Sequence, residues 1–463
     1  MAEHSGRRAV VLGGSMAGLL AARALAESHV DVTVVDRDPV KGVTEPRRGV
    51  PQGAHAHALL ARGQQVLEEL FPGLTKELAT AGIPMVDMAE MHWYLNGRRL
   101  RPAKTGLVAA TVARPDLESR IRTRVAALSN VRLRERCDIL GLVTTKDHSR
   151  VTGVRIRPQA RNSADETLEA DLVVDATGRG SRTPSWLEAF GYSRPPEERV
   201  TIRLSYTTCQ YRFPVSPLER DRSIIPLATP EQPRGAFFGR VAGDRHIVSL
   251  TSMLGDHPAS GLDGFREFAR TLPIPYVYQA IRDIEPIGGP AAIRFPASVR
   301  RRYERLIRFP DGLLVLGDAV CSFNPVYGQG MTVAALESLS LLRHLRHGPP
   351  QPRRFFQDIA KVVDAPWDIS AGGDLAWPGV EGRRTAKVRL GNAYLRRLQA
   401  AATNEGRITG AFMRVAGLVD PPPALMRPGT VLRVLRNCRP RPETGSSAEE
   451  RRTVPENAAR QAG

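Results

Sequence analysis

The sequence has few cysteines, and their spacing excludes several kinds of site. Cys137, Cys209, Cys321 and Cys438 lie far apart and form no C-x-x-C pair. This pattern disfavours a zinc site, a dithiol redox centre and a disulfide framework, because each of these needs cysteines brought together in pairs or clusters. We therefore expect no metal site, and we expect a reducing, cytoplasmic environment.

Long apolar runs are missing as well. The most apolar window, residues 9–26, is interrupted by Gly13, Gly14, Ser15 and Arg23. It is too short and too polar to cross a bilayer. The residues before it also lack the apolar stretch of a signal peptide, so we expect no membrane span and no export.

Acidic residues are outnumbered, since 48 Asp and Glu face 66 Lys and Arg and the net charge is +18. Such a charge can attract nucleic acid, an anionic carrier protein or an anionic membrane surface. The arginines are dispersed and lack the interleaved aromatic side chains that stack on bases, which disfavours nucleic acid. A carrier or a membrane surface stays open, and the sequence does not predict the oligomeric state.

The first positive signal is a strand, a glycine-rich turn and a helix at residues 9–25. The apolar run 9–12 enters G-G-S-M-A-G, and a helical pattern follows. Gly13 suits a tight turn and Gly18 a close approach of helix and strand, while the helix N-terminus offers N–H groups to a pyrophosphate. Ser15 stands where the G-x-G-x-x-G pattern has its second glycine.

The next strand strengthens this interpretation. Residues 32–35 are apolar or β-branched and end at Asp36, about 20 residues beyond the glycines, where dinucleotide-binding folds carry an acidic residue for the ribose hydroxyls. We therefore predict a dinucleotide-binding βαβ unit at the start of the chain.

A distant segment identifies the dinucleotide. An apolar strand at 312–316 ends in Gly317-Asp318, and the segment 324–331, N-P-V-Y-G-Q-G-M, opens a further helix. Gly328 and Gly330 permit close backbone approach to a flat ring, and the helix start places N–H dipoles near it. This combination resembles the Gly-Asp motif of the FAD-dependent aromatic hydroxylase superfamily, in which the aspartate binds the ribityl chain. The resemblance implies bound FAD.

Two more segments bear on this resemblance. Arg114 precedes Pro115 at a predicted helix start, a position where the superfamily has an arginine that contacts FAD. The strand 169–176 ends at a turn where the superfamily usually has Asp-Gly, but Thr177 replaces that aspartate, with Asp175 as a partial substitute. The chain has no second glycine-rich βαβ unit, so the resemblance implies that NADPH or NADH binds transiently at the flavin face.

The segments 47–57 and 318–332 narrow the resemblance. They are similar to the squalene-epoxidase-like bacterial flavin monooxygenases of polyether and terpenoid pathways, and the likeness extends over residues 7–345. His55 and His57 have two interpretations, as one could point toward the flavin or both could satisfy local hydrogen bonds, which we favour. The flavin-face candidates are Pro325, Gly328 and Gln329. The candidates for non-covalent FAD contacts are Gly13, Ser15, Met16, Ala17, Gly18, Asp36, Arg37, Arg48, Arg114, Asp318, Gly330 and Met331.

The expected fold class is α/β, with a Rossmann-type FAD-binding domain, an antiparallel β-sheet substrate domain and a helical C-terminal region. The middle of the chain alternates strand-like stretches, 201–206 and 245–250, with loops rich in Pro and Gly. We expect the FAD-binding domain at 1–183 and 301–347, the substrate domain at 184–300, the C-terminal helical region at 348–438 and a disordered tail at 439–463.

The resemblance implies an FAD-dependent monooxygenase of secondary metabolism that uses NADPH or NADH and O2. In the implied cycle, hydride reduces FAD, O2 adds at flavin C4a, and a substrate alkene attacks the distal peroxide oxygen. No acid or base is needed for an isolated alkene, so none is named. We expect epoxidation of a small lipophilic polyketide or terpenoid, in a pocket to which five aromatics could contribute: Tyr206, Tyr211, Phe213, Phe237 and Phe238.

Other functions stay open from the sequence. The same FAD domain could serve a hydroxylase of an aromatic substrate or a reductase of isoprenoid double bonds. A basic binding protein that keeps FAD only as a structural element is a different class of alternative. A flavin-dependent halogenase is disfavoured, because its W-x-W-x-I-P signature is missing.

Overall fold

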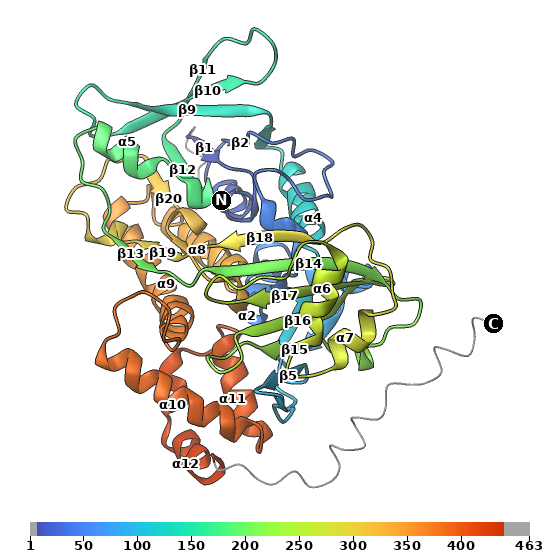
Figure 1. Cartoon of the computed structure of the whole chain (residues 1–463). Helices are drawn as coiled ribbons and strands as arrows, with labels where there is room; N and C mark the ends of the chain where they lie inside the picture. Colours follow the sequence, from blue (N-terminus) through green and yellow to red (C-terminus); the bar gives the residue numbers. More distant parts are fainter. Residues whose placement is uncertain (1–6, 439–463) are drawn as a thin grey trace.

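The computed structural model describes residues 7–438, and its centre is a five-stranded parallel sheet (Figure 1). Alternate residues of the first strand enter different cores, with Ala9 and Val11 on the side of the helices and Val10 and Leu12 on the other side. Burial of both faces is typical of a parallel sheet. The strands lie in the order β20 (Leu313–Val315), β12 (Leu172–Asp175), β1 (Arg8–Leu12), β2 (Asp31–Val35) and β8 (Val131–Arg134).

Helices cover one face of this sheet and a small antiparallel sheet covers the other. The close approach of α1 depends on Gly18, where a Cβ atom would lie 1.8 Å from the Gly13 carbonyl oxygen. The helices on the first face are α1 (Met16–Leu25), α4 (Arg114–Ala126) and α8 (Gly330–Leu345), with α2 (Ala61–Leu70) packed on α8. The opposite face carries β9 (Cys137–Thr144), β10 (Val151–Pro158) and β11 (Glu166–Glu169).

A seven-stranded sheet forms the second large unit and lies beside the helices of the first (Figure 1). Its neighbouring strands are antiparallel except β15 and β5, which run parallel. Two of its strands, β5 and β6, precede residue 184 in the chain. Its order is β18 (Ala291–Phe295), β14 (Leu204–Arg212), β17 (Arg245–Ser252), β16 (Arg234–Ala242), β15 (Ile224–Leu227), β5 (His92–Leu95) and β6 (Arg98–Arg99).

Two expectations for this sheet have different outcomes. The stretch expected at 245–250 is a strand within β17. The stretch expected at 201–206 is not one strand, because β13 (Glu197–Val200) ends before it and Arg203 has a φ of 48°. A left-handed residue cannot continue an extended strand, so β14 starts only at Leu204.

Helices α6 (Gly261–Arg270) and α7 (Tyr276–Ile281) cover one face of the seven-stranded sheet. Tyr211, Phe213 and Phe238 pack in the core beneath them. These three aromatics were expected to contribute to a substrate pocket, but the structure uses them to fasten the helices to the sheet. Tyr206, by contrast, belongs to the core of the parallel sheet.

The C-terminal helices follow α8 and close the molecule at the end opposite to β9–β11 (Figure 1). Leu60, Phe237, Leu398 and Met413 share an apolar cluster that joins these helices to the seven-stranded sheet. The helices are α9 (Pro352–Asp374), α10 (Ala386–Ala402), α11 (Gly406–Ala416) and α12 (Pro428–Asn437).

The remaining elements are short. Two further sheets are β13 with β19 (Ser298–Arg301) and β21 (Cys321–Ser322), and β3 (Ala58–Leu59) with β7 (Val108–Thr111) and β4 (Met85–Asp87). The last helices are α3 (Leu74–Thr80) and α5 (Thr183–Ala189).

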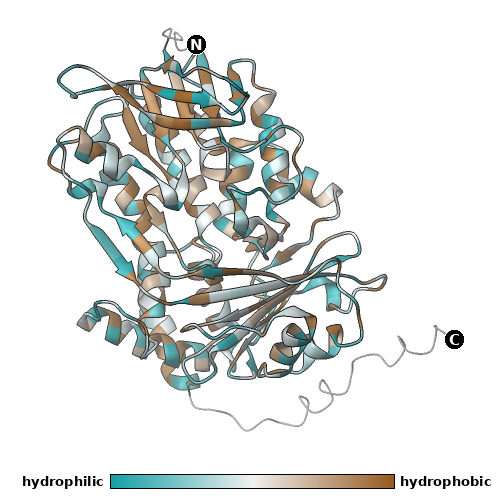
Figure 2. Ribbon diagram, turned by 45° about the horizontal axis from the view of Figure 1, so that its top comes forward, coloured by the Kyte–Doolittle hydropathy of each residue, from teal (hydrophilic) through white to brown (hydrophobic). Residues whose placement is uncertain are grey.

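Hydrophobic stretches mark the strands of both large sheets, and hydrophilic residues spread over the outer helices and loops (Figure 2). Within residues 7–438, no helix is both long enough and apolar enough to cross a membrane. The same range contains no group of three or more His, Cys, Asp or Glu side chains arranged to hold a metal ion. The expected α/β architecture with a helical C-terminal region is confirmed, whereas the expected tail at 439–463 lies outside the described residues.

Candidate functional site

The glycine turn after β1 is held against the ends of two neighbouring strands. Gly13 has a φ of 97°, and its N–H donates to the carbonyl of Val35 at 2.8 Å. A Cβ atom at Gly13 would lie 2.7 Å from the Ala176 carbonyl oxygen, so only glycine fits there. The Gly14 N–H donates to the Asp36 carboxylate at 2.6 Å. The predicted turn and the predicted acidic residue are therefore in direct contact.

A buried charge network lies beside this turn. Arg47 makes ion pairs with Glu118, with Asp36 at 3.5 Å and with Asp38 at 3.6 Å. Glu118 also accepts a hydrogen bond from Arg122 at 2.8 Å. Burial by itself would raise the pKa of the Glu118 carboxyl, but the surrounding arginines lower it, so this carboxylate is ionised.

The sequence-based analysis missed Arg47 and Glu118. It chose Arg48, which is exposed in the structure, whereas Arg47 is buried. The pair Arg47-Arg48 was a visible signal, but which of two adjacent arginines points inward depends on the loop conformation. Glu118 lies one helical turn after Arg114, and this i,i+4 spacing could have indicated an ion pair.

Arg114 connects the glycine turn to the Gly-Asp segment. Its Nη2 atom donates to the Ser15 hydroxyl at 3.0 Å, and that hydroxyl donates to Glu118 at 2.9 Å. Burial raises the pKa of the Asp318 carboxyl, and the positive charges of Arg114 and Arg179 oppose this rise. Segments that are some 300 residues apart in the chain, Ser15 and Asp318, thus share one arginine.

Gly178 and Gly330 lie close to the Asp318 side chain. A Cβ atom at Gly178 or at Gly330 would lie 3.9 Å from the Asp318 side chain. Gly317, with a φ of 66°, packs on Ala17, since a Cβ atom there would approach the Ala17 methyl to 2.7 Å. These contacts bring the N-terminal ends of α1 and α8 to the same edge of the parallel sheet.

The other expected cofactor residues separate into two groups. Met16 and Met331 are buried, with 2% and 6% of their surface exposed, at the starts of α1 and α8. Arg37, like Arg48, is exposed. The structure therefore brings together the predicted residues of the turn, Asp36, Arg114, Asp318 and the start of α8, and leaves the two exposed arginines at the surface.

Glu337 on α8 is another buried carboxyl, and it was not predicted from the sequence. It accepts a hydrogen bond from the Gly317 N–H at 2.5 Å and has 0% of its surface exposed. Burial raises its pKa to about 8, so it is protonated at neutral pH. Its contact fixes the backbone directly before Asp318.

The turn at Thr177 does not use Asp175 as expected, namely as a partial substitute for the missing aspartate. Asp175 is fully buried, and it accepts hydrogen bonds from the Thr177 N–H and from the hydroxyls of Thr177, Ser181 and Thr183 at 2.5–2.9 Å. Both carboxylate oxygens are used inside the turn itself. Asp175 consequently cannot present a carboxylate to a nicotinamide, and the idea that it partly substitutes for the missing aspartate is wrong.

The segment after η1 (Pro51–Ala54) contacts the seven-stranded sheet through histidine. His55 Nδ1 lies 2.8 Å from the Thr208 hydroxyl, which in turn lies 2.6 Å from the Ser249 hydroxyl. His57 Nδ1 lies 2.9 Å from the His55 carbonyl oxygen. Burial lowers the pKa of His55 to about 4 and that of His57 to about 3, so both rings are neutral. His57 makes the local hydrogen bond that we favoured, whereas His55 bonds to Thr208 on the distant strand β14.

The segment between β21 and α8 forms a tight turn. Asn324 caps η6 (Pro325–Tyr327) by accepting the Val326 N–H at 3.0 Å, and Gly328 has a φ of 66°. Gln329 is 1% exposed, and its Oε1 atom has no hydrogen-bond partner within the described range. Pro325 is exposed.

This turn meets the last residue of α9. Asp374 accepts hydrogen bonds on Oδ1 from Asn324 Nδ2 at 2.9 Å and from the Tyr327 hydroxyl at 3.1 Å. Its other oxygen, Oδ2, has no partner among residues 7–438. Burial raises the pKa of Asp374 to about 7. Asp374 is thus an acid–base group that the sequence did not reveal, because it lies 50 residues beyond the turn that it contacts.

Tyr206 on β14 completes this group from the side of the sheet. Its hydroxyl is buried without a partner in the described part of the chain, and its ring lies 5.9 Å from the ring of His55. Burial and the nearby Asp374 carboxyl raise the pKa of Tyr206. We call Tyr206, Tyr327, Gln329 and Asp374 the polar cluster.

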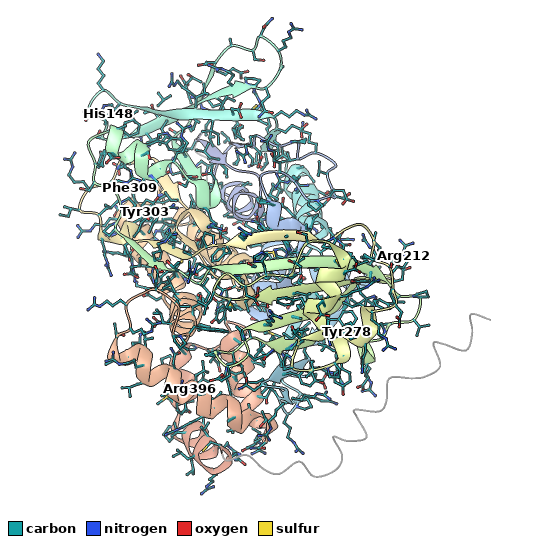
Figure 3. All side chains as sticks on the ribbon, viewed as in Figure 1. His148, Arg212, Tyr278, Tyr303, Phe309 and Arg396 are labelled. Carbon is teal, nitrogen blue, oxygen red and sulfur yellow. The ribbon has the colours of Figure 1, made fainter. Side chains whose placement is uncertain are left out.

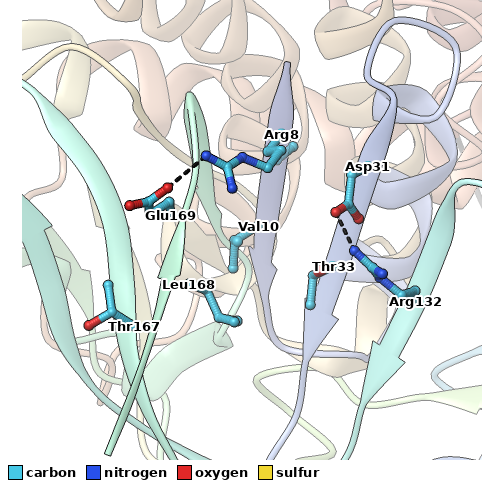
Figure 4. A pocket seen from close by; sticks show the side chains of 9 residues that line it. Arg8, Val10, Asp31, Thr33, Arg132, Thr167, Leu168 and Glu169 are labelled. Carbon is cyan, nitrogen blue, oxygen red and sulfur yellow. Dashed lines mark hydrogen bonds and ion pairs between the residues drawn. The ribbon is translucent and has the colours of Figure 1, made fainter. Parts of the chain in front are cut away.

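A groove at the opposite edge of the parallel sheet offers no comparable chemistry (Figure 4). It lies at the start of β1 and β2, and ion pairs of Arg8 with Glu169 and of Asp31 with Arg132 flank it. Ligands of such sheets bind at the carboxyl ends of the strands, which is the edge that carries the glycine turn.

The residues at that carboxyl edge fit a dinucleotide. Arg47 Nη1 and Arg114 Nε are buried and make no hydrogen bond among the described residues. They have only long ion pairs with carboxylates, at 3.5–3.6 Å, and both side chains lie beside the start of α1. Guanidinium groups and a helix N-terminus together suit a pyrophosphate. Asp36 directly follows β2, where dinucleotide-binding folds carry an acidic residue, and Asp318 lies near the start of α8.

Comparisons with known proteins agree with this geometry. The family model described as "FAD binding domain" matches residues 7–347. Protein Rv3254 of Mycobacterium tuberculosis is 38% identical over 80% of this chain and 80% of its own length. The kynurenine 3-monooxygenase of Salinispora arenicola is 27% identical over 71% and 70%. A flavoprotein/dehydrogenase structure from Cytophaga hutchinsonii has the same fold, with a TM-score of 0.64 at 14% identity over 89% of this chain and 93% of that one.

Proposed function

This chain belongs to the FAD binding domain family and is an FAD-dependent monooxygenase, and we propose that it epoxidises an electron-rich alkene in a lipophilic polyketide or terpenoid. NADPH or NADH is the usual co-substrate of the family. When bound, FAD supplies the electrons and activates O2, so the chain's own residues need to bind, orient and exclude water.

We further propose which residues hold FAD. Gly13 to Gly18 and the start of α1 receive the pyrophosphate, with Arg47 and Arg114 as its charged partners. Asp36 binds the adenosine ribose and Asp318 the ribityl chain. The start of α8, from Gly328 to Met331, borders the flavin ring. Arg37 and Arg48 are exposed, so we assign them to FAD contacts at the edge of the site.

The observation that carries the epoxidase proposal is the apolar wall beside the flavin-side turn. Leu60 lies next to Gly328, since a Cβ atom at Gly328 would be 3.6 Å from Leu60 Cδ2. Leu60 shares its apolar cluster with Ile225 and Phe237 of the seven-stranded sheet and with Ile369 of α9. An isolated alkene needs mainly apolar surroundings, and this cluster would supply them beside Gly328.

Hydroxylation of an aromatic ring is the second candidate, and Asp374 favours it. A phenol hydroxylase gains from a group that accepts the phenolic proton, and Asp374 is a buried carboxyl with an unpaired oxygen beside the flavin-side turn.

Two experiments test these proposals. The purified protein should be yellow and should release intact FAD on denaturation, and a colourless protein that cannot be reconstituted with FAD would contradict the cofactor assignment. Incubation with ¹⁸O₂, NADPH and paired alkene and phenol substrates should place label in an epoxide. Label only in the phenol ring would reject epoxidation and support the second candidate.

A further inference from the structure

We propose that the polar cluster binds a hydroxyl group of the substrate, with Asp374 as the residue that contacts it and Tyr206 as the second hydrogen-bonding partner. This inference rests on the proposed monooxygenase function. It adds a chemical feature of the substrate, a hydroxyl attached close to the carbon that is oxygenated, and it names the residues that select for that feature.

Two buried polar groups near the flavin-side turn are unpaired among the described residues. Asp374 is 0% exposed and Tyr206 is 8% exposed, yet Asp374 Oδ2 and the Tyr206 hydroxyl make no hydrogen bond within the part of the chain that the structure describes. A buried polar group without a partner costs about 1–3 kcal/mol, and such groups are rare in native proteins. The Asp374 carboxyl acts electrostatically on the Tyr206 hydroxyl, and a ligand that pairs with both groups would account for their unpaired state.

The Asp374 carboxyl is held in place by its other contacts. Asn324 and Tyr327 both donate to Asp374 Oδ1, which turns Oδ2 away from them. Gly373 allows this arrangement, because a Cβ atom there would lie 2.5 Å from the Tyr327 hydroxyl oxygen. One oxygen of the carboxyl is therefore fixed by protein donors, and the other is available in a defined direction.

The residues of the polar cluster come from both the flavin-side turn and the seven-stranded sheet. Asn324 and Tyr327 belong to the turn before α8, whereas Tyr206 belongs to β14 and lies beside His55. A group held by Asp374 and Tyr206 thus lies next to the turn that borders the flavin ring in the proposed function. The apolar wall around Leu60 is the neighbouring surface for the rest of the substrate.

The complementary chemistry is a hydroxyl, which can both donate to the carboxylate and accept from the tyrosine. An alkenol would keep its proton, and the cluster would only orient its double bond. With a phenol, ionised Asp374 would take the proton, the O–H electron pair would stay on the substrate oxygen, and the ring would become more electron-rich at its ortho and para carbons. Burial holds the pKa of Asp374 at about 7, so both forms of the carboxyl are available near neutral pH.

The test measures binding to the FAD-loaded enzyme rather than turnover. Two pairs of probes are titrated and followed by the change in flavin absorbance: 2-naphthol with 2-methoxynaphthalene, and geraniol with its methyl ether. We expect the enzyme to bind the hydroxyl probe of at least one pair tenfold or more tightly than its ether. The pair that shows this preference distinguishes a phenol from an alkenol.

Variants assign the preference to the cluster. Asp374→Asn should reduce the preference to threefold or less, and Tyr206→Phe should reduce it about threefold. Asp368→Asn is the matched control on the same helix, where the carboxylate pairs with Lys387 at the surface. Tyr303→Phe is the control for loss of a buried, unpaired hydroxyl, since Tyr303 lies away from the seven-stranded sheet and next to Phe309 (Figure 3).

Two results would overturn the inference. One is the absence of a hydroxyl preference in both probe pairs, including a failure to bind any probe. The other is a preference that survives unchanged in Tyr206→Phe or in folded Asp374→Asn at full FAD content. Failure to incorporate ¹⁸O would reject the oxygenation chemistry instead, and it would leave the binding difference measurable.

Discussion

The charge network around Glu118 and the polar cluster around Asp374 are built on different principles. Arg47, Arg114 and Arg122 all pair with Glu118, whose pKa they lower, so opposite charges compensate one another inside the protein. The polar cluster contains no arginine or lysine, and the pKa of Asp374 is raised. A cofactor that stays bound can occupy a site whose charges already compensate one another. A substrate that binds and leaves needs polar groups that have no partner in the free enzyme.

The largest expected effect comes from unbalancing the charge network. Glu118→Ala removes the shared partner of Arg47 and Arg122. Arg122 then loses its ion pair, and Arg47 keeps only its longer pairs with Asp36 and Asp38. We expect the free energy of unfolding to fall by about 3–5 kcal/mol, seen as a lower urea midpoint. The control is Glu77→Ala, which breaks half-exposed pairs with Arg120 and Arg124 and should cost about 1 kcal/mol or less. Equal losses would show that burial does not distinguish the two networks.

The next effect depends on pH and concerns Glu337. Its folded-state pKa is raised to about 8, so its stabilising contribution is complete below the unfolded value of about 4.5 and is lost as the pH rises through 8. Compared with Glu337→Gln, the natural protein should lose on the order of 3 kcal/mol between pH 5 and pH 9. Urea midpoints at pH 5, 7 and 9 measure this. A parallel pH dependence of both proteins would mean that Glu337 is not protonated in the folded state.

A smaller effect is expected on cofactor affinity. Asp318→Ala should weaken FAD binding by about 1.5–3 kcal/mol, because it removes a charge-assisted hydrogen bond, and this corresponds to roughly tenfold to a hundredfold. Cys321→Ala, three residues on and buried without a polar role, is the comparison. Titration of both apoproteins with FAD gives the result, and equal affinities would reject the assignment of Asp318.

The smallest effect separates two adjacent arginines. Arg48→Ala should change the urea midpoint and the FAD affinity by no more than about 0.5 kcal/mol, as expected for an exposed side chain. Arg47→Ala removes the buried partner of Glu118, so it should lower the urea midpoint and weaken FAD binding. If Arg48→Ala has the larger effect on FAD binding, the loop conformation in the complex differs from the one described.

The cofactor side of the fold could be predicted from sequence because its signals are local. An apolar strand lies close in sequence to each of Gly13, Gly18, Asp36 and Asp318. A strand that ends at a glycine or an aspartate can be recognised from a few neighbouring residues. The α/β architecture follows from the same patterns. The direction of Arg47 and the burial of Glu118 could not be predicted in this way, because they depend on a loop packing against α4.

The substrate side could not be predicted for a different reason. Tyr206, Tyr327 and Asp374 come from a strand, a turn and the end of a long helix, and no sequence spacing connects them. A pocket was expected because the middle of the chain contains several aromatic residues. Three of them, Tyr211, Phe213 and Phe238, instead pack against α6 and α7. Side chains alternate between the two faces of a strand, and which face meets α6 and α7 is decided by packing of segments distant in the sequence.

Gly373 places a condition on how this protein and its relatives can diverge. Its missing side chain is the space into which the Tyr327 hydroxyl reaches. The two positions should therefore change together: a relative with alanine or a larger residue at position 373 should carry a shorter side chain at position 327. Across an alignment, a tyrosine at 327 should occur almost only with a glycine at 373. The identity of residue 373 would then indicate, before any substrate is known, which relatives have kept this way of positioning Asp374.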